Sequence, residues 1–157
     1  MADFVFNVAL GAGRYFSDQV KAGNGGFRAV LLKAAEADST LRTRKTLAEV
    51  KAASGTSEAD WATGTVYARK TLAASDGLTI TVGATQVDVD VSDLTWLNAG
   101  STGTPQQLSD LLLCYAPASG PADSAIVPLT CHDYPEYANG ADITATLAAS
   151  GFYRAAG

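Results

Sequence analysis

Apolar and polar residues alternate over several short stretches of this 157-residue chain, most of them in its second half. In residues 78–82 and 87–91 every second residue is apolar, which is the period of a strand with one buried face. Residues 83–86, which begin with a glycine, suit a hairpin connection between these two strands. Further strands are predicted at residues 27–34, 67–72, 94–97, 111–116, 124–131 and 143–147. Of these, residues 27–34 are apolar on both faces, which indicates a central strand.

Two segments have helical rather than strand periodicity. The apolar residues of segment 8–21 fall on one helical face, and they are Val8, Ala12, Tyr15, Phe16 and Val20. Thr46 and Glu49 have the spacing of a capping box, in which each side chain satisfies a backbone N–H of the first helical turn. This spacing predicts a short helix over residues 47–54.

We therefore predict a mainly β fold of the α+β class. Its antiparallel β-sandwich or barrel of seven or eight short strands carries an N-terminal helix and one short internal helix. The length of 157 residues fits a single domain, residues 1–157. Hydrophobic residues make up 47% of the chain, which is enough for a packed core without a disulfide or a metal.

The basic residues stop abruptly at Lys70. Residues 1–70 contain ten Lys and Arg and seven Asp and Glu, a net charge of +3. Residues 71–157 contain one and nine, a net charge of −8, so the whole chain carries −5. The chain thus has a basic, helix-containing portion, residues 1–70, and an acidic, strand-rich portion, residues 71–157. We expect this asymmetry to fix the orientation in which the molecule docks on a charged neighbour.

Surface charges are therefore the candidate interface residues. The basic candidates are Arg42, Arg44, Lys45, Arg69 and Lys70, and the acidic candidates are Asp88, Asp90 and Asp93. Patches of opposite sign on one chain also allow identical subunits to dock on each other, which predicts a homo-oligomer. A nucleic-acid partner is not expected, because the chain is acidic overall and has no aromatic residues interleaved with its basic cluster.

No catalytic, cofactor-binding or metal-binding motif is found in the sequence. Asp88, Asp90 and Asp93 lack the glycine and the closing glutamate of a calcium loop, and their alternation with valines fits the solvated face of a strand. His132 is the only histidine, and no Gly-x-Ser-x-Gly motif accompanies it. We expect its ring at a strand end, hydrogen-bonded or solvated.

The two cysteines and the hydropathy of the chain bear on whether it binds zinc, crosses a membrane or is secreted. Cys114 and Cys131 lack the paired spacing of zinc ligands and are expected to be buried free thiols, with a disulfide between them as the alternative. No stretch approaches the 18–20 apolar residues of a membrane span, and the first residues lack the basic start of a signal peptide. Neither a membrane partner nor a secretory leader is expected.

Six segments of the chain, taken in order, carry a family resemblance. They are residues 1–9 (MADFVFNVA), 67–72 (YARKTL), 87–96 (VDVDVSDLTW), 112–117 (LLCYAP), 123–130 (DSAIVPLT) with His132 and Asp133, and 150–155 (SGFYRA). Together they resemble a family of small virion structural proteins of tailed phages that infect actinobacteria. The chain departs from the expected pattern at residues 11–13, where the family would have a more polar helix.

The resemblance implies a structural role in the virus particle and no enzyme activity. Within that role it implies a capsid decoration or cement protein of the minor capsid type, made in the host cytoplasm and bound on the outer surface of the head. Its partners would be the major capsid protein and its own copies, in a trimer. Such a protein bridges subunits of the assembled shell and needs no cofactor.

Two other functions stay open. The chain could be a tail- or fibre-associated protein of the same particle, or a carbohydrate-binding sandwich for host-surface adhesion. In the second case Trp61, Trp96 and Tyr137 are candidate platforms for sugars, although Trp96 follows an alternating strand and is better explained as a core residue. An enzyme is the least favoured class.

Overall fold

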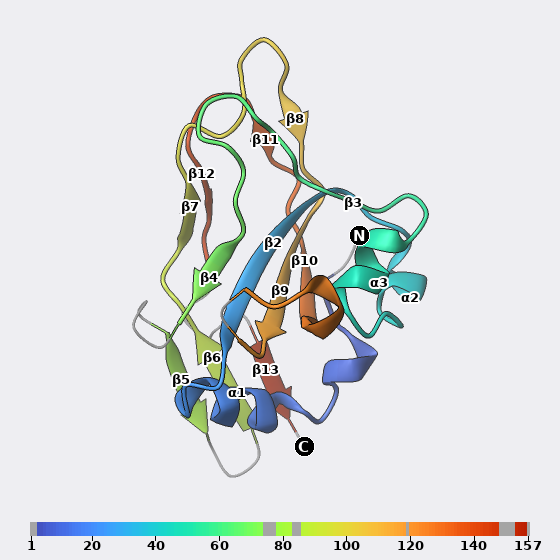
Figure 1. The fold of residues 1–157 in the computed structure, drawn as a ribbon, viewed down its shortest axis with the longest axis vertical. Coiled ribbons are helices and arrows are strands. Elements are labelled where there is room, and N and C mark those ends of the chain that lie inside the picture. The colour runs from blue at the N-terminus through green and yellow to red at the C-terminus, as the bar shows by residue number, and fades with distance from the viewer. Residues whose placement is uncertain (1–2, 74–77, 83–85, 119, 148–152, 157) are drawn as a thin grey trace.

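The three longest strands lie side by side in one antiparallel sheet (Figure 1). The computed structural model describes residues 3–73, 78–82, 86–118, 120–147 and 153–156. Strand β9 (Asp110–Ala116) pairs with β2 (Gly26–Ala34) on one side and with β10 (Val127–Asp133) on the other. The prediction of a central strand at residues 27–34 is confirmed.

Three short strands complete this sheet at its edges. β1 (Phe4–Val5) pairs with the outer edge of β10. β3 (Ser57–Glu58) and β4 (Lys70–Leu72) pair with successive parts of the outer edge of β2. Strands from residues 4–5 to residues 127–133 therefore meet in one sheet.

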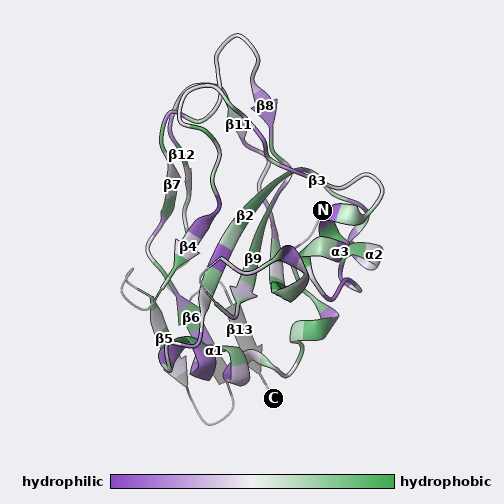
Figure 2. Cartoon of the chain, in the orientation of Figure 1, coloured by the Kyte–Doolittle hydropathy of each residue, from purple (hydrophilic) through white to green (hydrophobic). Residues whose placement is uncertain are grey.

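Both faces of the sheet are buried, because apolar residues occupy both sets of alternating positions. In β2, Phe27, Ala29 and Leu31 belong to the apolar cluster on one face. Val30 and Leu32 belong to the cluster on the other face, and none of these five residues has exposed surface. Every residue of β9 is buried as well. Figure 2 shows β2 and β9 as hydrophobic along most of their length.

Short helices and turns cover one face of the sheet. They are α2 (Asp38–Leu41), α3 (Leu47–Ala52) and the 3-10 turns η1 (Asn7–Ala9) and η2 (Asp123–Ala125). Leu41 from α2 and Leu47 and Val50 from α3 are fully buried in the cluster on this side. None of the helices within the described ranges has the length and apolar character that a membrane crossing requires.

The start of α3 follows the predicted capping pattern. The Thr46 hydroxyl accepts a hydrogen bond from the Glu49 N–H at 3.2 Å. The Glu49 carboxylate accepts from the N–H of Lys45 at 2.8 Å, one residue earlier than a standard capping box would place it.

Helix α1 (Gly13–Lys21) and two small β structures cover the opposite face. One is a three-stranded sheet in which β6 (Gln86–Asp90) lies between β5 (Thr79–Val82) and β13 (Tyr153–Ala156). The other is a ribbon of β7 (Leu94–Trp96) and β12 (Ile143–Ala145). Strands β8 (Gln106–Gln107) and β11 (Tyr137–Ala138) pair above it, at the upper end of the molecule in Figure 1.

The prediction of a mainly β, antiparallel fold is confirmed. The sheets stay open and do not close into a barrel. Within the described residues the strands number thirteen instead of seven or eight, because several pair over only two residues. Residues 124–126 were predicted to be part of a strand, but Ser124 and Ala125 lie in η2 and β10 begins at Val127.

The helices also differ from the prediction in detail. The N-terminal helix begins at Gly13 and not near Val8, because residues 7–9 form a 3-10 turn and Gly11 has a positive φ of 75°. Helix α2 was not predicted. The hairpin connection predicted at residues 83–86 falls mostly on residues outside the described part, although β5 and β6 do pair antiparallel.

The change of charge near residue 70 does not coincide with a boundary in the fold. β2, from the basic portion, is paired with β9, from the acidic portion, along seven residue pairs. The two portions therefore share one sheet and the apolar clusters on both of its faces, and the charge asymmetry of the sequence does not separate two bodies.

Candidate functional site

An ion-pair cluster holds the helical layer to one edge of the central sheet. Arg69, just before β4, donates to both oxygens of Glu58 in β3, at 2.6 and 2.7 Å. It also donates to the Asp123 carboxylate in η2, at 2.5 and 3.0 Å. Lys51 in α3 lies 2.8 Å from Asp123 and 3.1 Å from Glu58. These four residues, the Arg69 cluster, join four separate segments of the chain.

The pKa values in the Arg69 cluster follow from these contacts. The hydrogen bonds that Arg69 donates to Glu58, and then those to Asp123, raise the pKa of Arg69. Burial alone would raise the pKa of Glu58, but the hydrogen bonds and charges of Arg69 and Lys51 outweigh burial and hold it below its ordinary value. Hydrogen bonds from Arg69 likewise hold the pKa of Asp123 well below its ordinary range. All four groups are charged at neutral pH, and they neutralise one another.

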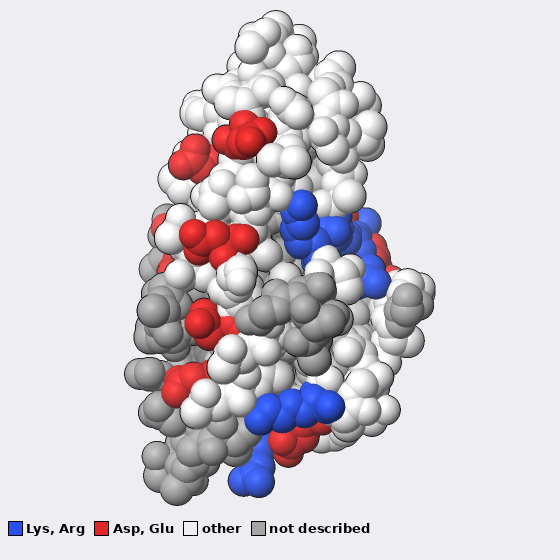
Figure 3. Space-filling model, turned by 90° about the vertical axis from the view of Figure 1, so that its left-hand side faces the viewer, with Lys and Arg blue, Asp and Glu red and all other residues white. Residues whose placement is uncertain are grey.

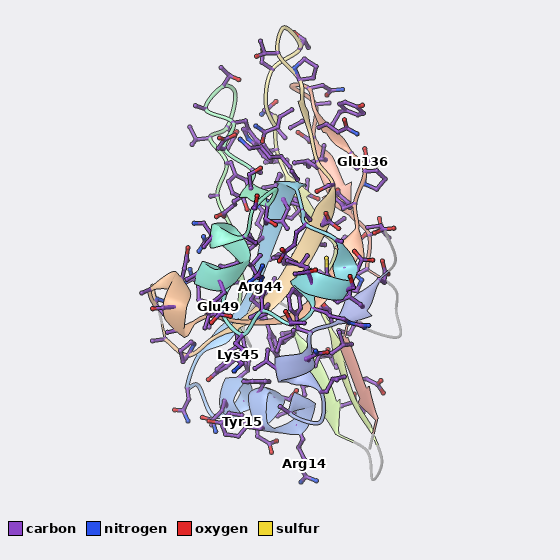
Figure 4. All side chains as sticks on the ribbon, turned by 90° about the vertical axis from the view of Figure 1, so that its right-hand side faces the viewer. Arg14, Tyr15, Arg44, Lys45, Glu49 and Glu136 are labelled. Atoms are coloured by element: carbon purple, nitrogen blue, oxygen red, sulfur yellow. The ribbon has the colours of Figure 1, made fainter. Side chains whose placement is uncertain are left out.

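The structure divides the predicted basic interface set into two groups. Arg69 and Arg44 are paired inside the chain, Arg44 with both oxygens of Glu36 at 2.6 and 2.8 Å. Arg42, Lys45 and Lys70 have no carboxylate partner among the described residues, and they remain the candidates for contact with another molecule. Figure 4 shows Arg44, Lys45 and Glu49 on the side of α2 and α3, with Arg14 and Tyr15 at the lower end.

Two of these unpaired cations lie over aromatic rings. The Arg42 guanidinium carbon is 5.4 Å from the centroid of the Phe4 ring. The Lys70 ammonium nitrogen is 5.7 Å from the centroid of the Trp96 ring. Both distances are within the range of a cation–π contact, which orients the cation without neutralising it.

The predicted acidic set lies on and just after β6. Asp88 and Asp90 are half-buried on this strand, which is paired on both edges. The Asp93 carboxylate accepts a hydrogen bond from the N–H of Leu147 at 3.0 Å, so it has a structural role in holding the chain after β12. The acidic and basic candidates therefore belong to different elements.

His132 joins two polar groups in an order that resembles a catalytic triad. Its Nε2 lies 2.9 Å from the Thr130 hydroxyl and its Nδ1 lies 3.1 Å from the Asp3 carboxylate. Thr130 is only 3% exposed, so its hydroxyl is not open to a substrate as a nucleophile must be. Asp3 also accepts from the N–H of Asp133, which fastens the segment before β1 to the end of β10. The expectation of a hydrogen-bonded histidine near a strand end is confirmed.

The cysteines are buried free thiols, as predicted. Burial raises the pKa of the Cys114 thiol to about 12 and also raises that of Cys131. Cys131 donates to the carboxylate of Asp110 at 3.6 Å, and Asp110 has no exposed surface. In the described part of the chain no group of three or more His, Cys, Asp and Glu side chains is placed to hold a metal ion.

Two of the three predicted sugar platforms are core residues. Trp61 is 6% exposed and Trp96 is 4% exposed. Their indole N–H groups donate to the carbonyl oxygens of Thr65 at 2.8 Å and Ala68 at 3.0 Å. The preference for Trp96 as a core residue is confirmed. Tyr137, which is 49% exposed, is the one of the three whose ring is open to solvent.

The two tryptophans line a small pocket that was not predicted from the sequence. The pocket has a volume of about 150 Å³ and is lined mainly by Trp61, Val66, Arg69, Lys70, Trp96 and Leu97. Val66 is 63% exposed and Leu97 is 56% exposed. Single apolar residues in polar loops are common and give no signal by themselves, so only the folded structure brings these two together. We call this site the tryptophan pocket.

Comparisons of the chain with protein-family models, with curated proteins and with solved structures find no match.

Proposed function

We propose that this chain is a structural protein of a phage particle, a decoration or cement protein on the outer surface of the head. The observation that carries the proposal is the distribution of exposed apolar side chains. Among the described residues five large hydrophobic side chains are exposed, and two of them, Val66 and Leu97, line the same pocket. Exposed apolar residues gathered on one part of a small protein favour contact with another protein.

The distribution of charge supports the same proposal. Figure 3 shows a face with basic side chains at mid-height and at the lower end, acidic side chains down one side, and none at the top. Contact surfaces between proteins are depleted of charged residues at their centre. The uppermost part of this face meets that condition, whereas the Arg69 cluster uses its charges internally.

The mechanism is adhesive and involves no bond making. A protein that binds neighbouring copies of the major capsid protein only when they are assembled stabilises the assembled state by mass action. Many equivalent weak contacts around a symmetric shell, and a trimeric form of the chain itself, would add to the strength of attachment through avidity.

Co-sedimentation tests this function. Purified chain is mixed with heads that lack decoration, and the pellet is analysed for bound protein at increasing concentration. Saturable binding supports the proposal, and failure of the chain to pellet with the heads would sink it. Isolated tails, run in parallel, detect the alternative of a tail- or fibre-associated protein.

A carbohydrate-binding role has one observation in its favour, the exposed ring of Tyr137. Aromatic rings stack on the apolar faces of sugars, and this ring lies on β11 at the upper end. Binding to a glycan array that is lost in Tyr137→Ala would favour this second function.

A further inference from the structure

We propose that the tryptophan pocket receives one apolar side chain from an extended acidic segment of the partner protein. The inference rests on the proposed function and adds the place and the chemistry of the contact. Four properties of the pocket carry it, namely its size, its apolar walls, its uncompensated positive charge and its fixed shape.

The size of the pocket selects a single side chain. Pockets that bind cofactors or drug-sized ligands usually have volumes of roughly 300–1,000 Å³. The tryptophan pocket, at about 150 Å³, is too small for such a ligand. One leucine, isoleucine or phenylalanine side chain is of the right order of size.

The pocket has apolar walls that are exposed to solvent in the free protein. Val66 and Leu97 are more than half exposed, while Trp61 and Trp96, which also line the pocket, are nearly covered. An apolar side chain placed between Val66 and Leu97 removes the surface of all three from water, which is favourable in proportion to the area buried.

The rim of the pocket carries a positive charge that no carboxylate of the described residues neutralises. Within the described residues Lys70 has no carboxylate partner, and its ammonium lies over the Trp96 ring. The neighbouring Arg69 is already bound to Glu58 and Asp123. A partner with a carboxylate next to its apolar side chain would complement Lys70, and basic side chains do gather at mid-height of the face in Figure 3.

The same geometry disfavours a sugar. Stacking needs an accessible ring face, and Trp96 is 4% exposed with the Lys70 ammonium above its ring. The pocket therefore offers a cation and aliphatic walls rather than an open aromatic platform.

The pocket is held in shape before the partner arrives. The indole N–H groups of Trp61 and Trp96 bind carbonyl oxygens of the segment that forms one wall. Thr65 donates its N–H to the Asn98 carbonyl at 3.1 Å, and Tyr67 donates to the Trp61 carbonyl at 3.0 Å. A preformed site loses little conformational entropy on binding, which favours recognition of a short segment.

The acidic strand of a second copy does not suit the pocket. Asp88 and Asp90 alternate with valines, but β6 is hydrogen-bonded on both edges and cannot present an extended segment. With β6 ruled out, we assign the acidic segment to a different protein, which in the proposed function is a protein of the shell.

Titration with short blocked peptides tests the pocket without any shell. The probes are a peptide with leucine flanked by two aspartates, the same peptide with lysines in place of the aspartates, and one with glycine in place of leucine. The readout is the movement of the two indole N–H resonances in NMR spectra of the whole chain. We expect the aspartate–leucine peptide alone to move them, and Leu97→Ser to weaken its binding at least about tenfold.

Lys70→Gln probes the charge, and two exposed residues at the other end of the molecule supply controls. We expect Lys70→Gln to weaken binding of the aspartate–leucine peptide about two- to fivefold at low salt, as for an exposed ion pair. Leu10→Ser and Lys21→Gln, both at exposed positions near α1, should leave it unchanged. Equal binding of all three peptides, binding of a glycan in place of the peptide, or no effect of Leu97→Ser would overturn the inference.

Binding to undecorated heads separates the two proposals. If wild-type chain binds heads and Leu97→Ser binds equally well, the pocket is not the contact and the proposed function stands. If wild-type chain does not bind heads but the peptide result holds, the pocket recognises acidic segments and the proposed function fails.

Discussion

At the scale of single residues, several charges of this chain are used within the chain itself. The sequence shows a basic portion and an acidic portion, but Arg69 connects the two by pairing with Glu58 from the first and Asp123 from the second. Of the five predicted basic interface residues, Arg44 and Arg69 turned out to be paired. No pattern in the sequence distinguishes them from Arg42, Lys45 and Lys70, because pairing depends on contacts between distant segments.

Replacement of Arg69 by methionine should destabilise the fold by roughly 2–3 kcal/mol, somewhat less than the 3–5 kcal/mol of a fully buried pair, because the cluster is partly exposed. Glu58 and Asp123 have lowered pKa values, so their contribution is complete above the ordinary carboxylate pKa of about 4 and is lost as the pH falls below it. As the pH falls from 5 to about 3, the free energy of unfolding of Arg69→Met should therefore decrease less than that of the wild-type chain.

Urea unfolding at several pH values measures this effect. Arg14→Met is the control, because the Arg14–Asp18 pair is exposed and long at 3.6 Å. It should change the free energy of unfolding by less than about 0.5 kcal/mol. If Arg69→Met loses as much stability at low pH as the wild-type chain does, the Arg69 cluster is not the cause of that loss.

Asp110 should have the opposite pH dependence. Burial raises its pKa, and the nearby Asp133 and Asp38 carboxylates raise it further. The folded state thus favours the neutral form, and this stabilisation is complete below the ordinary aspartate pKa and lost as the pH rises through the raised one. Relative to wild type, Asp110→Asn should gain stability as the pH rises from about 4 to 7. Thermal unfolding measures this across the pH range, with Asp18→Asn as the control. The same pH dependence of the melting temperature in both variants would contradict the raised pKa of Asp110.

At the scale of the elements, the periodic segments were predictable and the short ones were not. The alternation in residues 78–82 and 87–91 predicts β5 and β6, and the spacing of Thr46 and Glu49 predicts the start of α3. Helix α2, with four residues, is too short to show a period. Two-residue strands such as β3 and β8 are defined by their partners, so the sequence around them gives no signal.

The candidate site was predictable only in part, for the same reason. Lys70 and Trp96 were both singled out from the sequence, one as an interface charge and the other as a core residue. Their contact at 5.7 Å, and the pocket that they form with Val66 and Leu97, arise where the segment before β4 crosses the end of β7.

Gly100 allows two loops at the upper end of the molecule to approach closely. Gly100 has a φ of 76°, and a Cβ at this position would collide with the backbone of Ala138. Gly100→Ala should therefore destabilise the fold by more than about 1–2 kcal/mol, the cost of the left-handed conformation alone. Gly103→Ala is a matched control, since its φ is not positive and its nearest neighbour would be 3.8 Å away. Equal melting temperatures for the two variants would contradict this role.

At the scale of the whole molecule, the charge asymmetry predicts how attachment depends on salt. Replacing the unpaired cations Arg42, Lys45 and Lys70 with glutamine should weaken attachment to the shell more than replacing Asp88, Asp90 and Asp93 with asparagine. The difference should shrink at high salt, because exposed charges are screened over about 10 Å at 0.1 M. Pelleting with heads at two salt concentrations measures it, and the reverse ranking would mean that the asymmetry does not orient docking.

The most direct test of the central claim compares assembled heads with unassembled major capsid protein as binding partners for the wild-type chain. A protein that bridges neighbouring subunits should bind undecorated heads saturably and raise the temperature at which they fall apart, and it should bind the unassembled capsid protein far more weakly. Absence of saturable binding to heads, or equal binding to assembled and unassembled capsid protein, would contradict the account.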